Sequence, residues 1–326
     1  MAAFPDPLAS PFRRRDAPPL DPAKFRDPLV TAQGDARAIV PLTGLTTLWF
    51  NTGTLCNLAC ATCYIESSPT NDALVYISAA EVADYLDEIA RDRLPVREIG
   101  LTGGEPFMNR AIVDILDQCL ARGFDTLVLT NAMRPMRRFE SALLRLRAEY
   151  GARLTLRVSL DHHSRSVHEA ERGAGTWAKA LDGLGWLAAH GFSIAVAGRI
   201  LPGESEAAGR AGYRRLFDEI GLQIPAADAA HLVLFPEMDS NADIAEISEG
   251  CWSILGKSPG SVMCASSRMV VKRKGEARPR VAACTLLPYD SGFDLGGTLA
   301  EASRPVALNH PHCARFCVLG GASCSA

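Results

Sequence analysis

The sequence predicts an α/β fold that ends in a cysteine-rich region. Two observations carry this prediction. Short apolar runs recur six times between residues 46 and 237, and amphipathic stretches of helical period separate them. Such alternation is typical of βα units on a parallel sheet. Because six units are too few for a standard eightfold barrel, we expect a partial (β/α)6 barrel with its chemistry in the loops at the carboxyl ends of the strands.

The individual elements follow this rhythm in order. Ser78 is the expected N-cap of the first helix, and Gly123 is the expected C′ residue of the second. The predicted helices cover 78–94, 109–123, 139–151, 175–191 and 207–221, and the predicted strands cover 46–52, 96–104, 124–132, 153–161, 192–201 and 230–237.

Three regions are expected along the chain. Residues 1–42 are rich in Pro, Arg and Asp and show little periodicity, which predicts a flexible N-terminal leader. Residues 43–240 hold the βα rhythm of the partial barrel. Turn residues and cysteines increase after residue 240, and short β-rich runs appear, so a small cysteine-rich domain is expected over 241–326.

Composition excludes several classes of protein. The chain has 326 residues and a formal net charge of -3. Proteins that bind nucleic acid over a large surface are usually strongly basic, so this function is not indicated. No apolar run reaches the roughly 18 residues that span a membrane, and the first residues lack the apolar core of a secretory signal. We therefore expect a cytoplasmic protein with no membrane partner. In that compartment ten cysteines indicate metal or cluster ligation rather than disulfides.

Cys56, Cys60 and Cys63 form the first cysteine group, with the spacing CxxxCxxC. A compact loop brings such thiolates to one metal centre, and cysteine is the usual protein ligand of a [4Fe–4S] cluster. Three ligands leave one iron of a cubane open, which is a feature of reactive sites. Two alternatives stay open from the spacing alone: a zinc site, which would need a fourth ligand absent from this loop, and a set of buried free thiols.

This cysteine motif, placed after the first strand of a βα chain, resembles the signature of the radical S-adenosylmethionine (SAM) superfamily. The resemblance implies a [4Fe–4S] cluster whose unique iron chelates SAM. It also implies reductive cleavage of SAM to a 5′-deoxyadenosyl radical, which abstracts hydrogen from substrate. One departure is Thr62, because the family often has an aromatic residue there that packs on adenine; Tyr64 is a nearby ring that would compensate.

Other motifs gain their meaning from this resemblance. Gly103, Gly104 and Glu105 follow the second predicted strand and resemble the family's motif for the SAM amino group. Asn131 and Ser159 end the third and fourth strands and resemble positions that line the SAM pocket, although turn formation is the ordinary role of such residues. No catalytic residue is assigned.

Basic residues near the predicted active face are also candidates. Arg199 ends the fifth predicted strand, and we expect it to pair with the methionine carboxylate of SAM, the alternative being a solvated surface arginine. His162, His163 and His168 are interpreted as turn or surface residues, the alternative being contact with the substrate.

The C-terminal cysteines form a second group. Cys264 and Cys284 bracket a segment whose ends a β-hairpin would bring together, and Cys313, Cys317 and Cys324 follow. The arrangement resembles the SPASM/twitch extensions of radical SAM enzymes, which implies one auxiliary [4Fe–4S] cluster. The expected ligands are Cys264, Cys284, Cys313 and Cys317, with Cys324 as the substitute; a structural zinc site is the alternative.

The resemblance as a whole implies a radical SAM oxidoreductase or maturase that modifies a peptide or protein. A small-molecule dehydrogenase or rearrangement enzyme of biosynthesis is the alternative within the family, and a zinc-binding structural or regulatory protein is the alternative outside it. The implied partners are a peptide or small-molecule substrate and an electron donor such as flavodoxin or ferredoxin.

Overall fold

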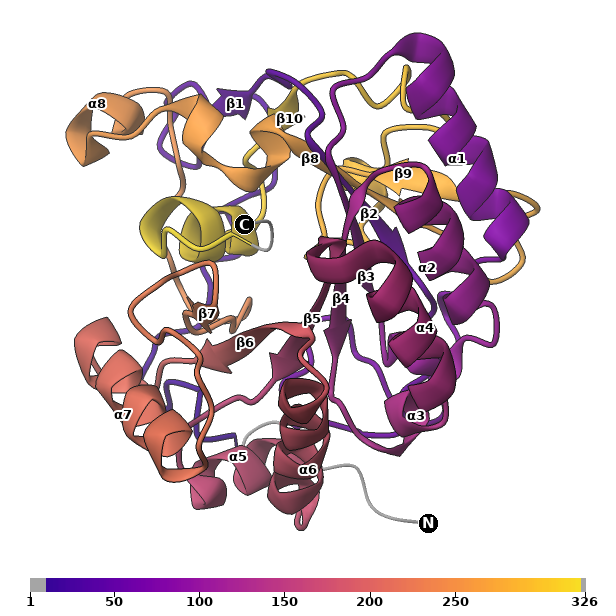
Figure 1. The fold of residues 1–326 in the computed structure, drawn as a ribbon. Helices are drawn as coiled ribbons and strands as arrows, with labels where there is room; N and C mark the ends of the chain where they lie inside the picture. The colour runs from indigo at the N-terminus through magenta and orange to yellow at the C-terminus, as the bar shows by residue number, and fades with distance from the viewer. Residues whose placement is uncertain (1–9, 324–326) are drawn as a thin grey trace.

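Eight strands form one sheet in the order β7-β6-β5-β4-β3-β2-β8-β9 (Figure 1). The structure is a computed structural model and describes residues 10–323. Neighbouring strands from β7 to β8 run parallel, and β9 runs antiparallel to β8. No strand pairing closes β7 onto β9 within residues 10–323, so the predicted partial barrel is confirmed. The strands are β2 (Thr47–Asn51), β3 (Glu98–Thr102), β4 (Asp125–Thr130), β5 (Leu154–Ser159), β6 (Ser193–Arg199), β7 (Leu232–Phe235), β8 (Ser267–Val271) and β9 (Arg280–Ala282).

The helices between the strands lie on the outer side of the curved sheet (Figure 1). The first begins as the sequence predicts, because the Ser78 hydroxyl accepts from the backbone N–H of Glu81 at 3.2 Å and the Glu81 carboxylate accepts from that of Ser78 at 2.9 Å. The helices of this layer are α1 (Ala79–Asp92), α2 (Ile112–Ala121), α3 (Arg134–Arg137), α4 (Glu140–Tyr150), α5 (Arg165–Arg172), α6 (Thr176–Ala189) and α7 (Glu206–Glu219). Within residues 10–323, none is both long and apolar enough to cross a bilayer.

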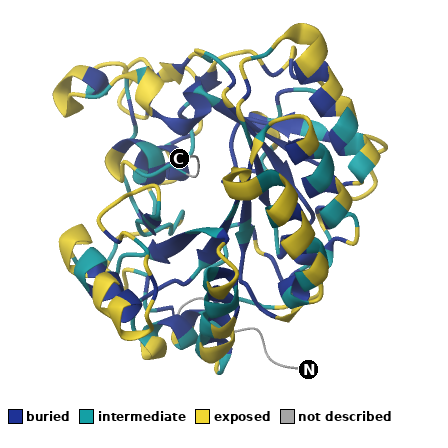
Figure 2. Ribbon diagram, in the orientation of Figure 1, coloured by how far each residue is buried: buried dark blue, intermediate teal, exposed yellow. Residues whose placement is uncertain are grey.

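Burial follows the sheet, with buried residues along the strands and exposed ones on the outer helix faces (Figure 2). Both faces of a covered parallel sheet are apolar, which explains strands such as β2, whose residues are all buried. Gly100 on β3 shows how closely the core is packed. A Cβ atom there would come within 2.3 Å of the Trp49 ring, so only glycine leaves room for that side chain.

The chain after β7 adds a cysteine-rich part that shares the main sheet. β8 pairs with β2, so this part is continuous with the barrel through the sheet. Its C-terminal turn lies near β7, where the rings of Phe235 and Phe316 are 5.3 Å apart between centroids (Figure 1). The remaining elements are β1 (Ile39–Val40), which pairs with β10 (Val306–Ala307), α8 (Cys251–Leu255), the π-helical turn Cys313–Leu319 and short 3-10 turns at Pro106–Met108, Gly151–Arg153, Pro259–Ser261, Met263–Ala265 and Ser291–Phe293.

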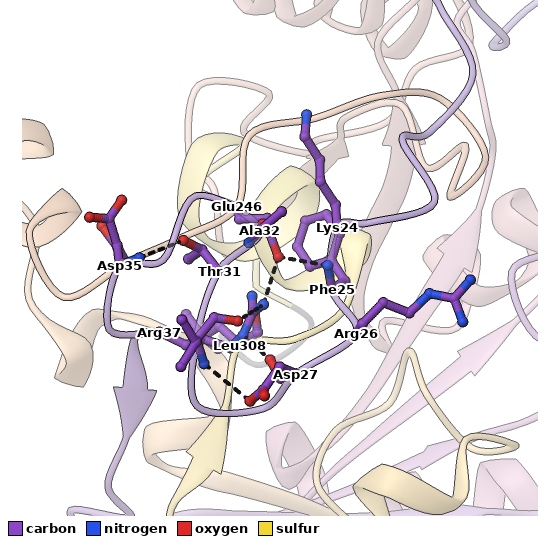
Figure 3. A network of polar contacts seen from close by, with 12 residues as sticks. Lys24, Phe25, Arg26, Asp27, Thr31, Ala32, Asp35, Arg37, Glu246 and Leu308 are labelled. Atoms are coloured by element: carbon purple, nitrogen blue, oxygen red, sulfur yellow. Dashed lines mark hydrogen bonds and ion pairs between the residues drawn. The ribbon is translucent and has the colours of Figure 1, made fainter.

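The predicted flexible leader is wrong for residues 10–42. Arg37 is 1 % exposed, and its guanidinium donates to the Glu246 carboxylate at 2.6 Å (Figure 3). That carboxylate also accepts from the backbone N–H groups of Phe25 at 2.6 Å and Ala32 at 2.7 Å. A segment without periodicity is thus held by polar contacts with a distant part of the chain, which composition does not reveal. Residues 1–9 lie outside the described residues.

Candidate functional site

A cavity of about 140 Å³ lies at the carboxyl ends of the parallel strands. Cys56, Cys60 and Cys63 all line it, so the three thiols of the first group face one space. The other predicted pocket residues on this wall are Gly103, Gly104, Asn131, Ser159 and Arg199. Segments far apart in the sequence supply an apolar wall, formed by Leu286, Phe235, Met238 and Phe316, which sequence reasoning missed because no local pattern marks it.

The three thiols lie in a loop that is partly buried. Cys56 Sγ accepts from the backbone N–H of Leu58 and Cys63 Sγ from that of Ser67, both at 3.4 Å. Burial raises the pKa of Cys56 to about 12, and it raises the pKa values of Cys60 and Cys63 as well. Thiolates at these positions therefore require compensating positive charge, such as a bound metal centre.

Glu171, at the end of α5, holds this loop in place. Its carboxylate accepts from the Thr62 backbone N–H at 2.8 Å and from the Thr62 hydroxyl at 2.7 Å. Its backbone carbonyl accepts from the N–H of Ala61 at 2.9 Å. Sequence reasoning missed Glu171, because nothing local indicates that this 1 % exposed carboxylate faces a loop more than a hundred residues earlier.

Arg172 adds a cation beside the thiols. Its guanidinium donates to both carboxylate oxygens of Asp161, at 2.8 and 3.0 Å. Burial raises the pKa of Asp161, but the guanidinium groups of Arg172 and Arg199 lower it by more, so that its pKa lies below the ordinary value. Arg172 also acts electrostatically on Cys60 and lowers its pKa against the effect of burial. Sequence reasoning assigned no role to Arg172, because no local pattern shows that its guanidinium faces Asp161 and the cysteine loop.

The two glycines let the loop after β3 lie against the cysteine loop. A Cβ atom on Gly103 would come within 2.5 Å of the Gly53 carbonyl oxygen, and one on Gly104 within 2.3 Å of the Leu55 carbonyl oxygen. Gly103 also has φ +141°, which other residues rarely adopt. The backbone N–H of Gly104 donates to the Gly53 carbonyl at 2.8 Å. The glycines therefore shape the cavity by close backbone approach.

Glu105 lies behind this wall and is 1 % exposed. Its carboxylate accepts from the Thr130 hydroxyl at 2.9 Å and from the backbone N–H groups of Asn131 at 2.8 Å and Phe107 at 3.2 Å. Burial raises its pKa to about 7, against the lowering effect of these donors. Glu105 thus fixes the end of β4 and with it Asn131; its expected contact with an amino group stays a prediction.

Arg199 is a nearly buried cation on the cavity wall, with 11 % of its side chain exposed. It donates to the Thr62 hydroxyl at 2.8 Å and to the Glu171 carboxylate at 3.1 Å. Its Nε is buried and has no hydrogen-bond partner within residues 10–323. Because the side chain lines the cavity, its positive charge would stabilise an anionic group bound there.

The second cysteine group lines a smaller cavity of about 20 Å³. Leu286 lines both cavities, so the second lies directly behind the apolar wall of the first. Burial raises the pKa of Cys313 well above its ordinary value, and the neighbouring thiols of Cys284 and Cys264 raise it further. The residues that share this cavity include Cys264, Cys284, Cys313, Cys317 and His312. Cys324 lies outside the described residues.

The spacing of the sulfur atoms differs from that of a zinc shell. Zinc–sulfur bonds of about 2.3 Å in a tetrahedron place the sulfurs about 3.8 Å apart. His, Cys, Asp and Glu side chains can each supply a metal ligand. Among those in residues 10–323, only His162, His163 and Glu204 form a group of three with ligand atoms within 4.8 Å of one another. Both cysteine groups are therefore spread more widely than a preformed zinc site.

The histidines near the cavity make hydrogen bonds and ring contacts within the protein. His162 Nδ1 accepts from the backbone N–H of Ser164 at 3.0 Å, which places the proton of the neutral ring on Nε2. That Nε2 faces the Glu204 carboxylate at 3.5 Å. His168 is fully buried against Trp177, and burial lowers its pKa to about 4. His162 and His163 lie in the turn between β5 and α5, as expected, but the expectation of a turn or surface position is wrong for His168, which is fully buried on α5.

Comparison with known proteins gives a family match. The family model described as "Radical SAM superfamily" matches residues 50–209, which include all three cysteines of the first group. The subtilosin biosynthesis protein AlbA of Bacillus subtilis is 34% identical over 143 residues, which are 44% of this chain and 30% of AlbA. The mycofactocin maturase MftC of Mycobacterium ulcerans is 30% identical over 146 residues, which are 43% of this chain and 36% of MftC. The chain thus spans about a third of the length of the curated relatives it matches.

Solved structures with the same fold are more distant in sequence. SuiB of Streptococcus suis bound to S-adenosylmethionine is 12% identical with a TM-score of 0.55, over 78% of this chain and 64% of SuiB. The protein anSMEcpe with bound AdoMet is 13% identical with a TM-score of 0.55, over 79% of this chain and 80% of that chain. At such identities the likeness establishes the fold alone.

Proposed function

We propose that this chain, a member of the radical SAM superfamily through residues 50–209, holds a [4Fe–4S] cluster on Cys56, Cys60 and Cys63 and cleaves S-adenosylmethionine reductively. The observation that carries the proposal is that the three thiols of this motif line one cavity together with the predicted SAM-pocket residues. When bound, the cluster and SAM supply the electron-transfer chemistry that begins hydrogen abstraction from a substrate.

The residues present fit these groups. Three thiols face the cavity, and Arg172 places positive charge beside them. Gly103 and Gly104 line the cavity and let the loop after β3 lie against the backbone of the cysteine loop. Arg199 is a cationic side chain that lines the cavity, so it is the proposed partner of the methionine carboxylate of SAM. Gly103, Gly104, Asn131 and Ser159 are proposed to line the same pocket, with Glu105 behind them.

The rest of the wall excludes water from the reaction. Phe235, Phe316, Met238 and Leu286 make the side of the cavity opposite the polar loops apolar. Reactive species formed in such a space are protected from side reactions with solvent. Thr62 stands where an aromatic residue was expected, but its hydroxyl joins Glu171 and Arg199, and Tyr64 lines the cavity instead.

A second cluster is proposed in the smaller cavity. Cys264, Cys284, Cys313 and Cys317 line it together, with Cys324 as the substitute ligand. Leu286 lines both cavities, so a substrate in the first cavity would lie near this centre. That placement suits an auxiliary cluster that accepts an electron from the substrate.

The proposed substrate is a peptide or protein. The names of the curated relatives, a bacteriocin biosynthesis protein and a maturase, support a role in making a modified product. A flavodoxin or ferredoxin is the proposed electron donor, and the cytoplasm is the proposed location. A precursor-peptide gene beside the gene for this chain would favour the peptide substrate, whereas an operon for a small metabolite would favour the small-molecule alternative.

Anaerobic reconstitution with iron and sulfide tests the two cluster sites. The unsubstituted protein should hold about eight iron atoms, four per cubane, and should release 5′-deoxyadenosine from SAM on reduction. Cys60→Ala should abolish this release, because one cubane would keep only two thiolates. Cys119→Ala is the matched control, since Cys119 is a fully buried core thiol on α2.

The auxiliary site has a separate outcome. Cys284→Ala should lower the iron content to about four atoms while sparing the cleavage of SAM. If Cys60→Ala and Cys119→Ala both released 5′-deoxyadenosine normally, the assignment of the first site would be refuted. If the unsubstituted protein held zinc and no iron, the zinc-binding alternative would replace the proposal.

A further inference from the structure

The N-terminal segment reaches the wall of the proposed SAM pocket. Ser10 and Phe12 are each 1 % exposed, although they precede the first strand of the barrel by more than 30 residues. The Ser10 hydroxyl donates to the Glu171 carboxylate at 2.6 Å. The Phe12 ring lies against Arg199, with 4.1 Å between the guanidinium carbon and the ring centroid.

These contacts act on the arginine that faces the cavity. Arg199 is held at its edge by the hydroxyl of Thr62 and the carboxylate of Glu171. The Phe12 ring supports the guanidinium over its face, an arrangement that is strongest where water is excluded. Edge and face contacts together fix the plane of the guanidinium, which a bidentate contact with a carboxylate requires.

The segment is anchored well beyond Phe12. Arg13 pairs with Asp239 at 2.8 Å, and Lys24 pairs with Asp243 at 2.8 Å. The backbone N–H of Leu20 donates to the Asn241 carbonyl at 2.7 Å. Successive contacts along the segment therefore hold Phe12 in position from outside the cavity.

We propose that the N-terminal segment is a functional part of the SAM pocket, in which Phe12 positions Arg199 for the methionine carboxylate of SAM. Ser10 supports the same group through Glu171. This inference rests on the proposed function of the site. Phe12 is a positioning residue, because it touches Arg199 and acts through it.

The substitution Phe12→Ala removes the face contact and frees the guanidinium to reorient. We expect the dissociation constant for SAM to rise about tenfold. The iron content should stay unchanged, because the contacts that hold the cysteine loop come from Glu171. Phe12→Leu keeps an apolar side chain in the buried site but has no ring face, so it should retain the melting temperature and still weaken SAM binding.

Phe25→Ala is the matched control. Phe25 lies in the same segment and also packs on an arginine, with the guanidinium carbon of Arg37 at 5.7 Å from its ring centroid, but it does not line the cavity. Its loss should lower the melting temperature and leave the affinity for SAM within a factor of about two. 5′-Methylthioadenosine, which lacks the carboxylate, is the second control, and its affinity should be the same in the unsubstituted protein and in Phe12→Ala.

The experiment measures equilibrium binding of SAM and of 5′-methylthioadenosine to the reconstituted, iron-loaded proteins. Weaker binding of SAM alone in Phe12→Ala and Phe12→Leu supports the inference. Unchanged SAM affinity in both variants overturns it, as does an equal loss of affinity for the two ligands, because that would indicate a general loosening of the pocket. Failure of the unsubstituted protein to bind SAM would refute the proposed function and this inference together.

Discussion

Glu171 and Thr62 are joined by two hydrogen bonds, at 2.8 and 2.7 Å, between the carboxylate of one and the backbone N–H and hydroxyl of the other. Thr62 lies between Cys60 and Cys63, so the end of α5 sets the shape of the proposed cluster loop. The same carboxylate holds Arg199. A single buried acid therefore links the cysteine loop to the proposed SAM-carboxylate site.

The substitution Glu171→Gln should weaken this link. Glutamine keeps the shape but loses the charge that compensates Arg199, and removing one partner of a buried ion pair is costly. We expect a loss of about 2–3 kcal/mol in the free energy of unfolding and a lower iron content after gel filtration. Glu206→Gln on the exposed face of α7 is the control. Equal stability and iron content in the two variants would contradict the role of Glu171.

Gly104→Ala tests the close approach of the two loops. The added Cβ would meet the Leu55 carbonyl oxygen at 2.3 Å, and that oxygen belongs to the backbone beside Cys56. We expect destabilisation of more than about 2 kcal/mol and poor iron retention. Gly185→Ala is the matched control, because a Cβ atom at this helical position meets nothing within 4 Å. Gly185→Ala should raise the free energy of unfolding by about 0.5–1 kcal/mol in thermal or denaturant unfolding. If both substitutions destabilised the protein equally, the contact at position 104 would not be the cause.

Arg172 and Asp161 form a bidentate pair in the cavity wall. Arg172→Ala should cost about 3–5 kcal/mol, because it leaves the Asp161 carboxylate buried without its partner. Arg172→Lys should recover part of this loss but not all, since an ammonium group does not reproduce the two parallel hydrogen bonds. Denaturant unfolding measures both values. Arg165→Lys, at an exposed position on the same helix, should change little, and full rescue by Arg172→Lys would show that charge alone matters.

The fold was largely predictable from the sequence, because the strands β2 to β7 and the longer helices carry their own periodic patterns, whereas the short helices α3 and α5 were not predicted. Ser78 and Glu81 are an example, since a capping box is a local signal. The ordered contact between Arg37 and Glu246 was not predictable, because their side chains meet across more than 200 residues of chain. The pairing of β8 with β2 was missed for the same reason.

Some residues of the candidate site were also predictable from local motifs, and others were not. Cys56, Cys60 and Cys63 form a local motif, and the structure brings them to one cavity. Glu105 also belongs to a local motif. One donor to its carboxylate is Phe107, in the 3-10 turn directly after Glu105, but another is Thr130, on the neighbouring strand β4. The apolar wall and the contact of Phe12 with Arg199 arise from tertiary packing, for which a single sequence holds no pattern.

Acid should weaken the anchoring of the N-terminal segment through Glu246. Burial raises the pKa of this carboxyl, but the Ala32 N–H, the Arg37 guanidinium and the Phe25 N–H lower it by more, so its pKa in the folded protein lies below the ordinary value (Figure 3). The unfolded chain then binds a proton at a higher pH than the folded chain does. The stability from this group is complete above the ordinary pKa of about 4.3 and is lost as the pH falls through the folded value.

Glu246→Gln isolates this contribution. The variant should be less stable than the unsubstituted protein at neutral pH, and the difference should shrink as the pH falls below about 4.3. Denaturant unfolding at a series of pH values measures it. If the two proteins lost stability in parallel on acidification, Glu246 would not be the titrating group.

The central claim is that three thiolates hold a cluster with one iron free to bind SAM. Electron paramagnetic resonance of the reduced, reconstituted Cys284→Ala variant tests this most directly, because only the first cluster should remain. The account predicts an iron–sulfur signal that changes when SAM is added and that is lost in the double variant Cys63→Ala/Cys284→Ala. A spectrum that does not change when SAM is added, or the absence of any iron–sulfur signal after oxygen-free reconstitution, would contradict the claim.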